Sequence, residues 1–272
     1  MRETLGRRSF GGVDGTPIWS RDGRHIYYQT EENSTAEIWR ALSNGSSSPE
    51  YITSTPFSRV DLETTSLGDE HIVYSENSST GGLYSYELNG QDSERAHSPL
   101  IGGNGERVSH SRISPDGNWI AYISSETGDR HLYIQSFPDT EMGKYQITSE
   151  TAVRSIEWDP VGTKIYFTTR ELAGAFESAG STQIFVVELE FGPEGESGRP
   201  EFLIARRPDL LVETDKSVNG NAPRFDVLSQ SEFIFTNDPE SVSRILESEV
   251  QVNVVENWFE ELAALAPPAG VQ

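Results

Sequence analysis

Residues 112–138 read RISPDGNWIAYISSETGDRHLYIQSFP, and much of the remaining chain repeats this stretch with variations. A turn made of Ser114, Pro115, Asp116 and Gly117 precedes the apolar run WIAYI, and a polar connection leads to the second run LYI. Proline fixes φ in such a turn, aspartate can bond its own backbone, and glycine accepts the left-handed conformation. Both runs are rich in β-branched and aromatic residues and are too short for helices. The stretch therefore predicts an antiparallel β-hairpin unit.

The same unit recurs along the chain. Two further copies keep turn residues of the same kind, with Asp22 and Gly23 in WSRDG and Gly162 in WDPVG. Two eroded copies, near residues 66–69 and 227–231, have lost part of the turn but keep the strand that follows it. We expect the repeated turn chemistry to be structural, with the Asp22 and Asp116 carboxylates capping the backbone rather than binding a metal ion.

The spacing of the copies defines the architecture. The first apolar residues after the first four turns are Ile26, Ile72, Ile120 and Ile165, at intervals of 46, 48 and 45 residues. The next step, to Phe233, is 68 residues long, which indicates an insertion of about 20 residues. A period of roughly 40–50 residues with several strands per unit is typical of propeller blades. The sequence thus predicts an all-β fold, a β-propeller of about five four-stranded blades.

The Trp-Ser-x-Asp-Gly and Ser-Pro-Asp-Gly units resemble the WD40-like repeats of TolB-type β-propellers, from about residue 15 to the C-terminus. Residues 124–147 are similar to a blade of propellers attached to bacterial serine/threonine kinases and winged-helix regulators, and residues 254–262 resemble the terminus of that group. The resemblance implies a non-catalytic interaction or sensing module, usually with six blades. Five are countable here, so both a closed five-bladed ring and part of a six-bladed one stay open.

The repeats predict one propeller domain over residues 1–272, without internal boundaries. Two insertions, 171–182 and 192–200, are expected to be projecting loops. Residues 5–10 are expected to supply a closing strand that pairs beside 251–255, and 257–266 to form a short C-terminal helix. The expected blades comprise residues 16–55, 56–102, 103–149, 150–206 and 207–256.

Composition excludes several classes of function. The net charge is −22, from 43 acidic and 21 basic residues, which argues against binding to nucleic acid or to an anionic membrane surface. It favours either simple solubility or a basic partner. There is no cysteine, and no stretch is long and apolar enough to insert into a membrane. The first residues, MRETLGRRSFGG, lack the apolar core of a signal peptide; the family resemblance would imply a periplasmic location.

The sequence offers no catalytic constellation and predicts no cofactor. A Gly-x-Ser-x-Gly elbow, a phosphate-binding glycine loop and a calcium loop are all missing from the chain. The five histidines have no spacing typical of metal ligands. We therefore expect neither catalytic nor metal-binding residues.

One polar pattern follows the strands expected to be innermost in their blades. One position before the first residue of each aligned turn lie Ile18, Thr64, Arg112, Glu157 and Asp226, and three positions before it lie Thr16, Leu62, His110, Ser155 and Arg224. Because side chains alternate along a strand, both sets are expected to point toward the axial channel. The charged members form the candidate binding site at the channel mouth: His110, Arg112, Glu157, Arg224 and Asp226. An ion pair between Arg112 and Glu157 of neighbouring blades is the structural alternative.

Two functions follow from these observations. The first is a binding module for a protein or peptide partner, or for a small polar ligand, detached from a kinase or transcription-regulator parent. The second is a small propeller hydrolase, similar to a lactonase or glycosidase, that uses Glu157 and Asp226 as its acid and base. Arginines aligned beside both carboxylates would keep them ionised, which favours the binding module.

Overall fold

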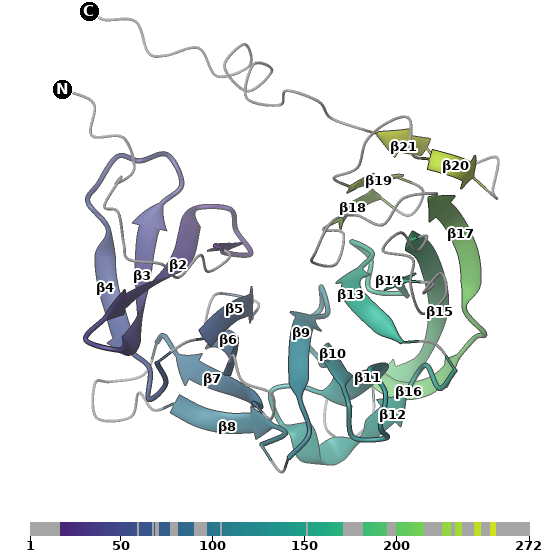
Figure 1. Ribbon diagram of the computed structural model, residues 1–272, viewed down its shortest axis with the longest axis horizontal. Helices are drawn as coiled ribbons and strands as arrows, with labels where there is room; N and C mark the ends of the chain where they lie inside the picture. Colours follow the sequence, from purple (N-terminus) through teal and green to yellow (C-terminus); the bar gives the residue numbers. More distant parts are fainter. Residues whose placement is uncertain are drawn as a thin grey trace, which may run out of the picture. The chain divides into compact units, whose positions relative to one another are not determined.

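The computed structural model describes the following parts of the chain: residues 17–58, 60–66, 68, 71–76, 81–89, 97–103, 105–150, 152–170, 182–194, 200–214, 225–229, 232–235, 242–245 and 251–253. Apart from 3-10 structure at Gly68 and in the short turn η2 (Thr140–Met142), the regular structure there is β-strand (Figure 1), so the predicted all-β fold is confirmed. The predicted closing strand at 5–10 and the helix at 257–266 lie outside the described residues. The chain divides into two compact units, Met1–Ile156 with Phe191–Ile204, and Glu157–Glu190 with Ala205–Gln272, and a single propeller domain stays a prediction.

The first unit contains three antiparallel sheets of four strands each, and each sheet falls within one predicted blade. In every sheet the strands lie side by side in chain order, as expected for a blade built from consecutive hairpins. The strands of the first sheet are β1 (Ile18–Trp19), β2 (His25–Glu32), β3 (Thr35–Leu42) and β4 (Glu50–Ser54). Those of the second are β5 (Val60–Thr65), β6 (His71–Glu76), β7 (Leu83–Glu87) and β8 (His97–Ile101). Those of the third are β9 (Val108–Ile113), β10 (Trp119–Ser124), β11 (His131–Ser136) and β12 (Lys144–Gln146).

Apolar residues fill the spaces between these sheets. One cluster joins the first two sheets and includes Tyr27, Ile38 and Tyr74, all fully buried. A second cluster joins sheets two and three around Val73, Ile120 and other buried residues. All six residues of β10 are buried, because this central strand is covered on both faces. Stacked blades explain this pattern, since each sheet packs its aromatic and β-branched side chains against the next.

The fourth sheet departs from the predicted blade boundary. Its strand order is β13–β14–β15–β17–β20, and β16 pairs with β15 off this path. Because β17 pairs with β15, the boundary predicted between residues 206 and 207 lies inside this sheet. The strands are β13 (Val153–Trp158), β14 (Lys164–Arg170), β15 (Thr182–Glu194), β16 (Pro200–Ala205), β17 (Asp209–Thr214) and β20 (Val242–Ile245).

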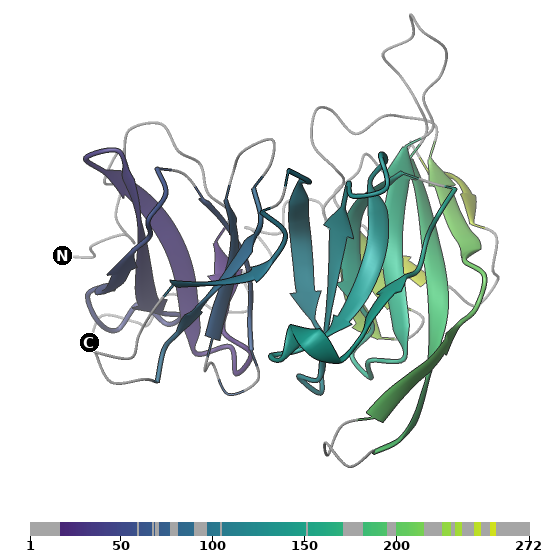
Figure 2. The same ribbon diagram turned by 90° about the horizontal axis from the view of Figure 1, so that it is seen from below.

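The long strand β15 accounts for this difference. Its 13 residues are enough for β15 to pair with both β17 and β16. β15 and β16 together form a projecting hairpin (Figure 2). Pro208, which lacks a backbone N–H, lies in the break between β16 and β17. The insertion predicted as a loop at 192–200 is therefore strand up to Glu194 and again from Pro200.

The fifth sheet contains three described strands, β18 (Phe225–Ser229), β19 (Glu232–Phe235) and β21 (Gln251–Asn253). The sequence predicts a third strand at 251–255, and β21 occupies that place. It runs parallel to β19, however, whereas β18 and β19 pair in the antiparallel direction. The segment between them contributes β20, which pairs with β17 in the fourth sheet. A chain that returns through another sheet can approach its partner strand in the same direction, which explains the parallel pair.

Candidate functional site

The repeated turns use serine and aspartate to hold the backbone. At the first turn, the Asp22 carboxylate accepts a hydrogen bond from Arg24 N at 2.9 Å, and Ser20 Oγ donates to the same oxygen at 2.7 Å. Gly23 has φ of +70°, which a residue with a side chain rarely adopts. These contacts satisfy the turn internally, and they give the Asp22 carboxylate a structural role.

The third blade repeats this arrangement. Asp116 accepts from Ser114 Oγ and from Asn118 N, while Pro115 precedes it and Gly117 has φ of +79°. The fourth turn replaces the serine with an aspartate that is fully buried: Asp159 Oδ1 accepts from the backbone N–H groups of residues 163 and 164, both at 2.7 Å. Gly162 closes this turn with φ of +84°.

The candidate site lies where two inner strands meet. β5 and β9 contact each other within the first unit, in the region where Figure 1 shows them side by side. Each strand carries a β-bulge: the register shifts between Leu62 and Thr64 in β5, and opposite Ala121 and Ile123 in β9. A bulge breaks the alternation of side chains and frees a backbone group from the ladder. The extra residue of β5 is Glu63.

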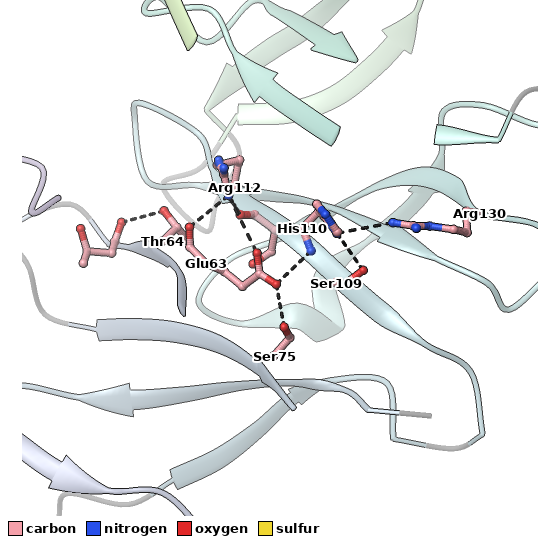
Figure 3. A network of polar contacts seen from close by, with 9 residues as sticks. Glu63, Thr64, Ser75, Ser109, His110, Arg112 and Arg130 are labelled. Carbon is pink, nitrogen blue, oxygen red and sulfur yellow. Dashed lines mark hydrogen bonds and ion pairs between the residues drawn. The ribbon is translucent and has the colours of Figure 1, made fainter. Parts of the chain in front are cut away.

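Glu63 connects the two strands through its carboxylate (Figure 3). Its Oε1 accepts from Ser75 Oγ at 2.7 Å and from the backbone N–H of His110 at 3.0 Å. Its Oε2 lies 3.9 Å from Nη1 of Arg112, and the Glu63 side chain is only 8% exposed. The His110 backbone has φ of +55°, an unusual value for a residue with a side chain, which turns its N–H out of the ladder and toward Glu63.

Arg112 is held at the surface end of this network. Its side chain is 34% exposed, and its Nη1 donates to the carbonyl oxygens of Glu63 at 3.1 Å and Ser111 at 2.9 Å. The guanidinium group is therefore fixed by backbone acceptors as well as by a carboxylate. A positioned, half-exposed guanidinium can bind a carboxylate, a phosphate or a peptide carbonyl group.

His110 continues the network in the opposite direction. Its Nδ1 lies 3.0 Å from Ser109 Oγ and 3.4 Å from Nη2 of Arg130 (Figure 3). Since a guanidinium group only donates, Nδ1 accepts from Arg130, and the ring proton is then on Nε2. The polar chain thus runs from Arg112 through Glu63 and His110 to Arg130.

Burial controls the electrostatics of the network. It raises the pKa of the Glu63 carboxyl, while the charge of Arg112 and hydrogen bonds from Ser75 and the backbone of His110 and Ser111 oppose that rise. Burial also lowers the pKa of Arg130 to about 10, with further lowering by nearby arginines. Both groups are therefore easier to neutralise than their exposed counterparts.

Arg21 forms a second connection between the inner strands. From the first turn, its Nε donates to Thr65 O at 3.3 Å, and its Nη2 donates to Ser114 O at 3.3 Å and to Ile113 O. One guanidinium group thus binds the carbonyl ends of β5 and β9. This contact ties the first blade to the second and third at the edge of the repeated turns.

The structure brings together only part of the predicted site. His110 and Arg112 share β9 and belong to one network, as described above. Glu157 lies in β13 within the second unit, where it is half-buried, so its predicted pair with Arg112 stays a prediction. For Asp226 the structure describes the backbone, in β18, and Arg224 lies outside the described residues.

Sequence reasoning missed Glu63. Strict alternation predicts that Thr64 and Leu62 share one face of β5, which leaves Glu63 on the other. All three residues are buried in the structure, because the bulge at Glu63 breaks the alternation of side chains along β5. The available signal was chemical, because Glu63 interrupts the otherwise apolar and threonine-rich end of this strand.

Over the described residues, no group of three or more histidine, aspartate or glutamate side chains is arranged to hold a metal ion. In that same part of the chain, no helix has the length and apolar character needed to cross a membrane.

The described sheets and their repeated turns define a protein of β-propeller type. No family model and no curated protein matches the sequence. Among solved structures, a protein assigned as TolB from Agrobacterium tumefaciens matches with a TM-score of 0.51 and 19% identity, over 70% of this chain and 64% of that one. TolB from Acinetobacter baumannii matches with a TM-score of 0.49 and 18% identity, over 74% and 47%.

Enzymes share the fold as well. A puromycin-hydrolysing peptidase from Mycobacterium tuberculosis matches with a TM-score of 0.50 and 13% identity, over 74% of this chain and 31% of that one. At such identities the similarity establishes the TolB-like propeller fold alone. The chain spans less than two thirds of the length of each of these structures.

Proposed function

We propose that this protein is a non-catalytic binding module that holds a protein or peptide partner through polar side chains of its inner strands. The observation that carries the proposal is the fixed, half-exposed Arg112 guanidinium beside the buried Glu63. Donors that are already held in place lose little conformational freedom on binding, and this loss is one of the costs of forming an interface. The resemblance of the repeats supports a sensor or scaffold role, detached from a kinase or transcription-regulator parent.

A small propeller hydrolase is the second candidate, and one observation favours it. The pKa of Glu63 is raised by burial, as is usual for a general acid in an active site. The geometry favours binding nevertheless. Glu63 Oε1 is occupied by Ser75 and by the His110 backbone, and an 8% exposed side chain offers little access to a substrate. The carboxylates chosen from the sequence, Glu157 and Asp226, remain to be tested.

The binding role is tested with an array of immobilised peptides of varied charge, probed with the fluorescently labelled full chain. We expect selective binding that Arg112→Ala weakens by about tenfold, the effect of one charge-assisted hydrogen bond. Arg40→Ala is the matched control, because Arg40 forms a surface ion pair with Glu50. Equal loss in both variants, or no selective peptide at all, would contradict the proposal.

The hydrolase alternative is tested separately with lactone, glycoside and peptide substrates. The binding role predicts no turnover by the wild-type chain. Turnover that is abolished by Glu63→Gln, Glu157→Gln or Asp226→Asn would establish catalysis and replace the proposed function.

A further inference from the structure

Two arginines flank the same end of the central strand β10. Ser124, the last residue of that strand, is opposite Val108 on one side and His131 on the other. Arg107 directly precedes Val108, and Arg130 directly precedes His131. The strand register therefore places these two arginines at one end of the third blade, on either side of β10.

A third arginine reaches the same end from the neighbouring strand. The backbone N–H of Val153, the first residue of β13, donates to the carbonyl oxygen of Arg130 at 2.8 Å. Arg154 follows immediately and is close enough to repel the Arg130 charge, as is Arg107. The fold thus gathers Arg107, Arg130 and Arg154. Arg130 is half-buried, and its charge interacts with those of the other two arginines.

None of these three guanidinium groups pairs with a carboxylate in the part of the chain that the structure describes. Nη2 of Arg130 lies instead 3.4 Å from Nδ1 of His110. Glu106 and Asp129, the chain neighbours of two of the arginines, form no ion pair with them. The sequence has 43 acidic and 21 basic residues, so a cluster of three arginines without a carboxylate partner is unexpected in this chain.

We propose that Arg107, Arg130 and Arg154 form an oxyanion site, which takes the carboxylate or phosphate group of the ligand held by this binding module. Burial, and then the like charges of Arg154 and Arg107, lower the pKa of Arg130 to about 10. An oxyanion would remove the repulsion and accept several hydrogen bonds, since planar guanidinium groups bind carboxylate and phosphate through paired donors. The inference rests on the proposed binding function and names its ligand class.

The test uses the full chain and three probes: sodium sulfate, sodium phosphate and sodium succinate, each compared with sodium chloride at equal ionic strength. Isothermal titration gives the dissociation constants, and thermal unfolding reports stabilisation of the native state by a bound anion. We expect Arg107→Gln and Arg154→Gln each to weaken anion binding by about tenfold, the factor for one charge-assisted hydrogen bond. Both side chains lie at the cluster's edge, so the variants are expected to fold.

The matched control is Arg206→Gln, because exposed Arg206 already pairs with Glu188 and Glu190. Sulfate also stabilises proteins nonspecifically, and this control measures that effect. Tighter binding of succinate than phosphate assigns a carboxylate ligand, and the reverse assigns a phosphorylated one. An equal response in wild type, control and both cluster variants would overturn the site. If peptide binding still depends on Arg112 in that case, the proposed function stands without this inference.

Discussion

Glu63 joins two blades, so its removal should affect the structure strongly. Glu63→Ala deletes the acceptor of Ser75 Oγ and of the His110 N–H, and it removes the carboxylate beside Arg112. A buried donor left without a partner costs about 1–3 kcal/mol. The Arg112 side chain is 34% exposed and water can solvate its charge, so losing the ion pair with Glu63 adds little to the loss of stability. We therefore expect Glu63→Ala to lower the free energy of unfolding by about 2–5 kcal/mol.

Glu63→Gln separates the charge from the hydrogen bonds. The amide oxygen can still accept from Ser75 and His110, so the loss should be about 1 kcal/mol or less near pH 5. The pKa of Glu63 is raised in the folded state, so the native protein retains this proton at pH values where the unfolded chain has lost it. The wild-type stability therefore falls as pH rises above the unfolded pKa of 4.5, and levels off above the folded pKa.

The glutamine variant lacks this titration, so its stability relative to wild type should improve with rising pH over the same window. Urea unfolding of wild type and both variants at several pH values between 4 and 8 measures these differences. Glu50→Gln, at an exposed ion pair on β4, is the control for general charge effects. The reasoning is refuted if Glu63→Ala costs less than about 1 kcal/mol, or if the difference between wild type and Glu63→Gln is independent of pH.

Three further predictions concern the turns and the contacts between blades. Hydrogen bonds lower the pKa of Asp22, so its stabilisation is present above the unfolded value of 3.8 and lost as pH falls through the folded one; Asp22→Asn should reduce the acid sensitivity of unfolding. Gly23→Ala should cost about 1 kcal/mol through its positive φ alone, because no atom lies within 4 Å of the added Cβ. Gly102→Ala should cost more, since the added Cβ would lie 2.6 Å from Val108 Cγ2. Equal melting temperatures of the two variants would contradict this prediction. Arg21→Ala should lower stability by about 1–3 kcal/mol in denaturant unfolding, because carbonyl groups of two other blades lose their donor.

The repeat unit predicted the blades well because its signal is local. The turn at Ser114 to Gly117 and the strands on either side of it need only near neighbours, and the spacing of Ile26, Ile72 and Ile120 reports the sheet period directly. The fourth blade was harder to predict. There an insertion that looks like a loop by composition extends β15, and the contacts of the resulting hairpin are not local.

Those contacts involve aromatic residues of the inserted hairpin. The Phe191 ring lies 5.5 Å from that of Trp119, and the Phe202 ring lies 4.4 Å from that of Tyr145. Glycine, proline and glutamate around the two phenylalanines indicate a loop, because composition describes solvent exposure rather than partners. The hairpin forms because these rings bury one another on the third blade, and the strand pattern of 182–194 alone does not specify that surface.

The candidate site was only half predictable for a different reason. Choosing residues by alternation presumes an unbroken strand, and both inner strands of the site are bulged. The bulge in β5 turns Glu63 inward, and the bulge in β9 presents the His110 N–H to it. Each irregularity satisfies the other, since the carboxylate accepts the donor that the ladder has released. A carboxylate bound in this way stabilises the strand junction, and Arg112 and Arg130 lie at the two ends of the network. Because the Glu63 carboxylate is committed to hydrogen bonds within the strand junction, we propose anion recognition rather than acid–base chemistry as the function of this site.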